Sequence, residues 1–162
     1  MREGEEAATR EVPQSVYSRG VAAGPQRTGS SAPRQRVLVV DDDGAIRRMV
    51  ARLVERENFT TEMCGDGVSA LAQINREWFD VIVLDVTMPF MSGYDVIDAL
   101  RTENPDAVRR VILMTAAVRR REDVGVFAVL LKPFDIGELT RLVRSCAAFQ
   151  REGEGATVSG DA

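Results

Sequence analysis

Histidine is absent from this chain of 162 residues. That absence excludes serine or cysteine nucleophiles activated by histidine, histidine metal sites and phosphorylation on histidine. Lysine is almost absent as well, because Lys132 is the one lysine among the 21 basic residues and the others are arginine. A lysine kept at a single position suggests a task for its ammonium group, although chance placement is an equal alternative when the residue is considered alone.

Cysteine is scarce, and long apolar runs are missing. Cys64 and Cys146 form no metal-ligand or redox spacing, so we expect two reduced thiols in a cytoplasmic protein. The longest apolar runs have four to six residues, far short of a membrane span. The N-terminal stretch MREGEEAATREV has no apolar segment behind its charges and is not predicted to be a secretory signal. The net charge of −4 gives no general reason to expect direct nucleic-acid binding.

The composition divides the chain into three parts. Residues 1–35 are rich in Gly, Ser, Pro, Ala, Glu and Arg and poor in large apolar side chains, which predicts a disordered N-terminal tail. For this tail, an unselected leader or a misplaced start is favoured over an interaction arm. Residues 150–162 are predicted to be a second disordered tail. Residues 36–149 are long enough for one folded domain of ordinary size.

The central part alternates between strand and helix patterns. Short β-branched runs predict strands buried on both faces of a parallel sheet, at Val37–Val40, Val81–Leu84, Val111–Met114 and Val126–Leu131, with a weaker strand at Phe59–Cys64. Apolar residues recur at helical spacing between the strands, most clearly in residues 46–54 and 139–147. Asp43, and Asp135 with Glu138, are typical of helix N-termini. The alternation predicts an α/β fold, a (βα)5 doubly wound parallel sheet.

Polar side chains follow the strong strands directly. Asp41 and Asp42 follow the first, Asp85 the third, Thr115 the fourth and Lys132 the fifth. Alone, each has an ordinary explanation as a turn acid, a loop residue, a strand-end hydroxyl or a solvated charge. Together they should meet at one edge, because ligands of open parallel sheets bind at the carboxyl ends of the strands. Crowded carboxylates need a neutralising cation, and a set of oxygen ligands without histidine or thiolate favours Mg²⁺ over Zn²⁺.

At these residues the sequence resembles the receiver domain of two-component response regulators, in the stretches VLVVDDD, DVIVLDVTMPFMSG, VILMTA and LLKPFD. The resemblance extends over roughly residues 36–149. It implies a flavodoxin-like fold with strand order 2-1-3-4-5, in which ligands bind where the strand order reverses. It further implies Mg²⁺ as cofactor and a histidine kinase or histidine phosphotransfer protein as phosphoryl donor.

The resemblance also implies a role for each matching residue. Asp85 is implied as the phosphoacceptor, Asp42 as a Mg²⁺ ligand with Asp41 as its partner acid, and Thr87 as the residue whose backbone carbonyl binds the metal. Thr115 is implied as the hydroxyl that bonds the phosphoryl group, Lys132 as the conserved lysine before a cis bond to Pro133, and Met88, Pro89 and Gly93 as the loop after the acceptor. The compact charge of an ammonium gives a physical reason to retain lysine at this position.

Two features depart from the family pattern. Val129 stands three residues before the lysine, where receivers usually carry Tyr or Phe, so coupling to output is in question. About ten residues, AAVRRREDVG, remain for the crossover between the last two strands, which predicts a shortened fourth helix and a weakened common dimer. Arg119, Arg120 and Arg121 lie in this crossover and are interpreted as a solvated turn, with an acidic partner as the alternative.

These observations predict a stand-alone, chemotaxis-type receiver that signals through a downstream protein, with no enzymatic turnover beyond its own phosphorylation and dephosphorylation. One alternative is a degenerate receiver that acts as a phosphorylation-independent scaffold. A second is an aspartyl-phosphate phosphatase of the haloacid dehalogenase type, which is disfavoured because Thr87 stands where that family needs a second acid. Being part of a larger protein also remains open.

Overall fold

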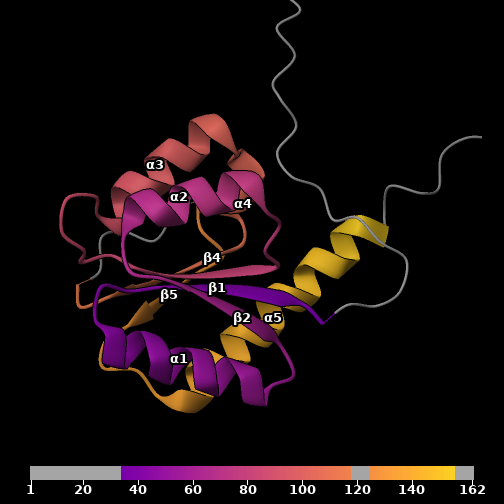
Figure 1. Ribbon diagram of the computed structural model, residues 1–162. Helices are drawn as coiled ribbons and strands as arrows, with labels where there is room; N and C mark the ends of the chain where they lie inside the picture. Colours follow the sequence, from indigo (N-terminus) through magenta and orange to yellow (C-terminus); the bar gives the residue numbers. More distant parts are fainter. Residues whose placement is uncertain (1–33, 118–124, 156–162) are drawn as a thin grey trace, which may run out of the picture.

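The computed structural model describes residues 34–117 and 125–155, with side chains described up to residue 151. Within these residues five strands form a single parallel sheet of order β2-β1-β3-β4-β5 (Figure 1). The strands are β1 (Arg36–Val40), β2 (Thr60–Cys64), β3 (Val81–Asp85), β4 (Val111–Thr115) and β5 (Ala128–Leu131). The predicted fold class and strand order are therefore confirmed.

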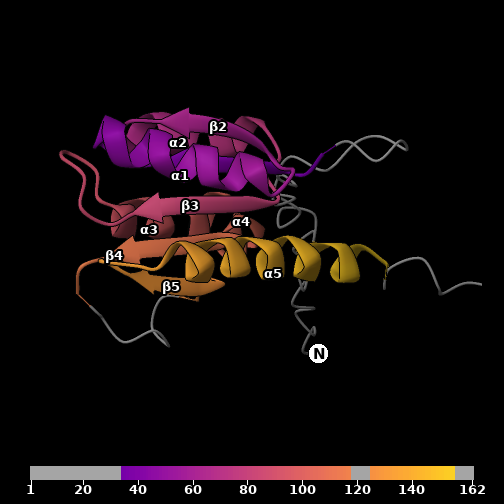
Figure 2. The ribbon, with the colours of Figure 1, turned by 90° about the horizontal axis from the view of Figure 1, so that it is seen from below.

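Helices cover both faces of the sheet. The described helices are α1 (Gly44–Arg56), α2 (Gly67–Arg76), α3 (Gly93–Glu103), α4 (Pro105–Val108) and α5 (Ile136–Gly155). Figure 1 has α2, α3 and α4 above the sheet and α1 and α5 below it, and Figure 2 looks at the α1 and α5 side. No helix of the described residues is long and apolar enough to span a bilayer.

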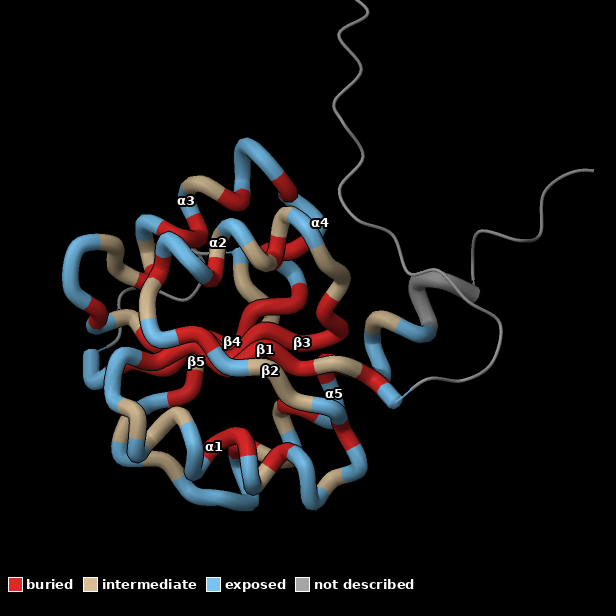
Figure 3. The backbone as a smooth tube through the Cα atoms, viewed as in Figure 1, coloured by how far each residue is buried: buried red, intermediate tan, exposed pale blue. Residues whose placement is uncertain are grey.

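Alternation along the buried strands builds a separate core on each face. In β1, Leu38 and Val40 pack toward the cluster that holds residues of α2 and α3, whereas Val37 and Val39 pack toward the cluster of α1 and α5. Successive strand side chains point to opposite faces, so a strand that is apolar at every position fits only in the middle layer. The tube in Figure 3 is accordingly buried along the centre of the sheet and more exposed on the outer turns of the helices.

The helix starts follow the predicted capping chemistry. The Asp43 carboxylate accepts hydrogen bonds from the backbone N–H groups of Ala45 and Ile46 at the first turn of α1. Asp135 accepts from the N–H groups of Gly137 and Glu138 at the start of α5. Each cap lies just beyond a strand end, so the same turns that start these helices also carry site residues.

Several boundaries differ from the sequence prediction. β5 begins at Ala128 rather than at residue 126, because Val126 and Phe127 pack against the core without joining the ladder. The short helix α4 precedes β4, where none was predicted, and begins at Pro105. α5 itself ends at Gly155. Cys64 and Cys146 are free and buried, which agrees with the expectation of reduced thiols.

Three expectations fall on residues that are not described. The predicted shortened fourth helix and Arg119–Arg121 belong to the crossover between β4 and β5, of which residues 118–124 lie outside the described part. The same applies to most of both predicted tails. The domain boundaries at residues 35 and 149 therefore stay predictions.

Candidate functional site

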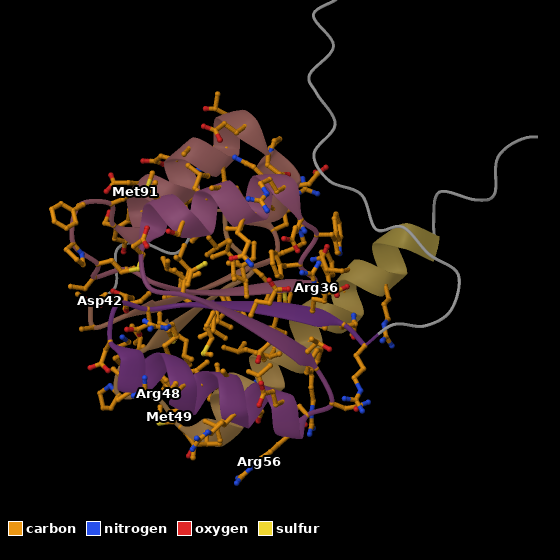
Figure 4. All side chains as sticks on the ribbon, in the orientation of Figure 1. Arg36, Asp42, Arg48, Met49, Arg56 and Met91 are labelled. Atoms are coloured by element: carbon orange, nitrogen blue, oxygen red, sulfur yellow. The ribbon has the colours of Figure 1, made fainter. Side chains whose placement is uncertain are left out.

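The carboxyl ends of the central strands bring the predicted site residues together. β3 and β4 end at Asp85 and Thr115, and Asp41 follows β1 directly. In the sheet register Asp85 lies beside Met114, and Thr115 lies beside Leu131, the residue before Lys132. Figure 4 places the labelled Asp42 at this end of the molecule, with Arg36 at the opposite end of the sheet.

Lys132 joins the two buried acids. Its Nζ lies 2.7 Å from Asp85 Oδ1 and 3.2 Å from Asp41 Oδ2. The side chains of Asp85 and Asp41 are only 4% and 1% exposed, so a charge on either needs a partner. The ammonium supplies that partner, and it remains a quarter exposed at the rim of the site.

Burial and charge shift both partners of this contact. Burial raises the pKa of the Asp85 carboxyl above its ordinary value, and the hydrogen bond and charge of Lys132 offset only part of that shift. Burial is the largest single influence on Lys132 and lowers its pKa, but the hydrogen bonds and charges of Asp85 and Asp41 together outweigh burial, so the pKa of the ammonium is raised. The acceptor candidate is thus a carboxylate held in a low-dielectric site by a firmly protonated lysine.

Asp42 completes a cluster of three carboxylates. One oxygen from each of Asp41, Asp42 and Asp85 lies within 4.8 Å of the other two, and Asp42 is the exposed member. Hard divalent cations take oxygen ligands, and Mg²⁺ is usually bound through one or two carboxylates together with water. The donor set therefore fits Mg²⁺, and the exposure of Asp42 leaves one side open to solvent.

Thr115 lies at the same edge but makes a local contact. Its side chain is buried, and its hydroxyl donates to the Ala117 carbonyl at 2.9 Å and accepts from the Ala117 N–H at 3.2 Å. The structure thus brings Thr115 to the predicted edge, with the hydroxyl engaged by its own turn rather than by the acids or Lys132.

The loop after Asp85 is held close to the strand end. The Gly93 N–H donates to the Val86 carbonyl at 3.0 Å, and a Cβ at Gly93 would lie 2.4 Å from the Asp85 carbonyl oxygen. Only glycine fits that approach. Phe90, with a positive φ of 65°, is fully exposed on this loop. A backbone hydrogen bond from Thr87 offsets a small part of the burial that raises the pKa of Asp85, while the predicted role of the Thr87 carbonyl stays a prediction.

The remaining expectations concern β5. The bond between Lys132 and Pro133 is cis, as the resemblance implies. Val129 is partly buried, packs against the core cluster of α2 and α3, and pairs with Leu113 of β4. The expectation that valine at this position alters the coupling to output stays a prediction.

One close contact of the site was missed by the sequence reasoning. Arg47, in the first turns of α1, donates from Nη1 to the Asp41 backbone carbonyl at 2.6 Å. The available signal was a basic residue one helical turn after the acids, but the neighbouring Arg48 offers nearly the same signal. In a chain with so many arginines, the sequence does not separate the two.

Comparisons with known proteins agree with this geometry. The response regulator receiver domain family matches residues 37–144. The chain is 41% identical over 114 residues to the probable transcriptional regulatory protein TcrX of Mycobacterium tuberculosis, an alignment that covers 67% of this chain and 48% of TcrX. This chain spans about half the length of the curated relatives it matches.

Solved structures give the same result. The receiver domain of the Francisella response regulator 1452 has a TM-score of 0.65 and 30% identity, covering 72% of this chain and 99% of that one. The response regulator TrrA of Thermotoga maritima, solved in complex with Mg²⁺ and BeF, has a TM-score of 0.62 and 29% identity, covering 69% of this chain and 98% of that one.

Proposed function

Because this chain belongs to the response regulator receiver domain family, we propose that it accepts a phosphoryl group on Asp85 from a histidine kinase or a histidine phosphotransfer protein. The reaction depends on Mg²⁺, and the phosphorylated domain signals through a protein partner. The observation that carries this proposal is the meeting of Asp85 with Asp41, Asp42 and Lys132 from three strand ends.

The chemistry is a transfer between two nucleophiles. An Asp85 carboxylate oxygen attacks phosphorus, a new O–P bond forms, the N–P bond to the donor imidazole breaks, and the imidazole leaves with that electron pair. Bound Mg²⁺ supplies charge neutralisation for the phosphoryl oxygens. Asp41 and Asp42 would hold the cation from the side of β1, and Asp85 presents its oxygen from the centre of the sheet.

Lys132 and Thr115 must change partners in this reaction. The Lys132 ammonium contacts Asp85 Oδ1 in the unphosphorylated chain, so phosphorylation there transfers the ammonium to a phosphoryl oxygen. The Thr115 hydroxyl is bonded within its own turn and has to leave Ala117 to reach the same group. A group that changes partners on phosphorylation couples the site to the crossover after β4, which begins at residue 116.

The test is the intact mass of the protein after incubation with acetyl phosphate and Mg²⁺. We expect the gain of one phosphoryl group, its loss when EDTA replaces Mg²⁺, and its loss in Asp85→Asn. Asp98→Asn is the matched control, because Asp98 is an exposed aspartate paired with Arg101 on α3. Phosphoryl uptake that persists in Asp85→Asn, or that is the same with EDTA as with Mg²⁺, contradicts the proposal.

The alternatives predict different results. A phosphorylation-independent scaffold takes up no phosphoryl group and binds its partner equally well as Asp85→Asn. A phosphatase of the haloacid dehalogenase type turns over phosphate esters, but exposed Thr87 occupies the place of its second acid. The name of the relative TcrX, a probable transcriptional regulatory protein of which the alignment covers 48%, supports a second form of output in which a further domain acts on DNA. The stand-alone interpretation stays a prediction beside it.

A further inference from the structure

Arg47 reaches the site from α1 without contacting any of the three carboxylates in the described interactions. Its Nη1 donates to the backbone carbonyl of Asp41 at 2.6 Å. The guanidinium also lies between two glycines, because a Cβ built on Gly65 would be 3.3 Å from Nη1 and one built on Gly44 would be 3.6 Å from Nη2. Arg47 therefore bridges the turn after β1 and the turn after β2.

The contact acts on Asp42 through the peptide bond. The carbonyl of Asp41 and the N–H of Asp42 belong to one planar unit, so a hydrogen bond to that carbonyl fixes the plane in which the Asp42 backbone begins. The following peptide is fixed as well, because the Asp43 N–H donates to Asp41 Oδ1 at 2.8 Å. Both peptides that flank Asp42 are thus held, although its side chain is exposed.

We infer that Arg47 is a positioning residue of the metal site, which fixes the peptide between Asp41 and Asp42 and so directs the Asp42 carboxylate toward the cation. Mg²⁺ demands a near-ideal octahedral arrangement, so a carboxylate that swings freely binds it less tightly than one that is held. Partners that orient metal ligands commonly change metal affinity by about 10-fold to 100-fold when they are removed. The inference rests on the Mg²⁺ dependence of the proposed function.

The adjacent arginine provides the control. Arg48 carries the same charge on the same helix turn, but it is exposed and lines a surface groove of α1 together with Met49 and Leu53. Figure 4 labels Arg48, Met49 and Arg56 along this outer side of α1. A purely electrostatic influence on the acids would be similar for both arginines, whereas the hydrogen bond to Asp41 belongs to Arg47 alone among them.

The experiment is calorimetric titration of the full chain with MgCl2 at a fixed ionic strength. We expect Arg47→Ala to raise the Kd for Mg²⁺ about tenfold, Arg47→Lys to fall between that variant and wild type, and Arg48→Ala to stay within about twofold of wild type. In two-dimensional amide NMR spectra of the metal-free proteins, the Asp42 signal should shift further in Arg47→Ala than in Arg48→Ala. If Arg47→Ala does not fold, the comparison of Arg47→Lys with Arg48→Ala carries the test.

The outcomes separate this inference from the proposed function. Unchanged Mg²⁺ affinity in a folded Arg47 variant overturns the inference and leaves the proposed function intact. Equal weakening by Arg47→Ala and Arg48→Ala also overturns it, because general electrostatics then explains the effect. Failure of the wild-type chain to bind Mg²⁺ overturns the proposed function and the inference together.

Discussion

Lys132 and Asp85 are 47 positions apart in the chain, yet the ammonium and the carboxylate lie 2.7 Å from each other at the carboxyl edge of the sheet. The same ammonium reaches Asp41, 91 positions away. In the absence of a metal ion this lysine is the cation that permits two carboxylates to be buried side by side. In the proposed function, Lys132 and Mg²⁺ would therefore compete electrostatically for the same acids, although phosphoryl transfer would use both.

Lys132→Met should separate metal binding from phosphoryl transfer. Removing the ammonium leaves the buried carboxylates of Asp41 and Asp85 without their positively charged partner, so we expect a loss of about 2 kcal/mol of unfolding free energy in EDTA near pH 7. Mg²⁺ affinity should rise severalfold, because a competing positive charge is gone, while labelling by acetyl phosphate should fall at least tenfold. Calorimetry and intact mass measure the two effects, and Lys132→Arg, which keeps the charge, should bind Mg²⁺ nearly as wild type does. Equal loss of both properties in Lys132→Met would contradict this account.

Asp85→Asn should stabilise the metal-free protein at neutral pH. Since the folded pKa of Asp85 is raised, the native state binds its proton more tightly than the unfolded chain does, and stability falls as pH rises from the ordinary carboxyl pKa through the raised one. Above that window the ionised carboxylate is a fixed cost, which the amide removes. We expect an increase in Tm of about 3 °C at pH 7 in EDTA, shrinking toward zero near about pH 4. A variant less stable than wild type at pH 7 would show that the bond to Lys132 outweighs burial.

Gly93→Ala and Gly44→Ala should behave oppositely. At Gly93 the new Cβ meets backbone, 2.4 Å from the Asp85 carbonyl oxygen, so the strand end that carries the acceptor has to move. We expect about 2 kcal/mol of destabilisation and slower labelling. At Gly44, the first residue of α1, the nearest atom is the flexible end of the Arg48 side chain, and alanine should be neutral or stabilising by about 0.5 kcal/mol. Urea unfolding and intact mass measure both variants, and a tolerant Gly93→Ala would refute the tight loop packing.

Arg110→Ala should be strongly destabilising, in contrast with its neighbour. Arg110 is buried, its guanidinium lies 3.8 Å from the Trp78 ring centroid, and its Nη1 donates to the Phe79 carbonyl at 2.6 Å. Burial lowers its pKa to about 10, which still leaves it charged at neutral pH. We expect Arg110→Ala to lose about 3 kcal/mol and exposed Arg109→Ala to lose less than about 0.5 kcal/mol in urea unfolding followed by circular dichroism. Similar losses for both would mean that the stacked contact contributes little.

The fold and the acidic site were predictable because their signals are local. Unbroken β-branched runs such as Val81–Leu84 suit only a strand that is buried on both faces. Because the sheet is parallel, Asp85 at the end of that run lies at the carboxyl edge, where ligands bind. The beginning of β5 was misplaced because the apolar side chain of Val126 packs against the core, although its backbone is not part of the sheet. The short helix α4 could have been predicted from Pro105, since proline favours a first helical position.

Contacts that depend on side-chain direction were not predictable. Nothing in the sequence distinguishes Arg47, which bonds the Asp41 carbonyl, from Arg48, which faces solvent, because one position on a helix changes the direction of a side chain by about 100°. The hydrogen bond from Thr115 to Ala117 could not be predicted from the sequence either, since a hydroxyl at a strand end can point to its own loop or toward the acids. These choices are decided by packing of the finished fold.

The sheet order has a consequence for the time at which the site comes into existence. Asp41, Asp42 and Asp85 are translated well before Lys132, which arrives only with β5, the last strand added beside β4. A nascent chain therefore carries the complete set of acids while its only lysine is still to come. The contact between the Lys132 ammonium and the Asp85 carboxylate therefore forms only after β5 has joined the sheet beside β4.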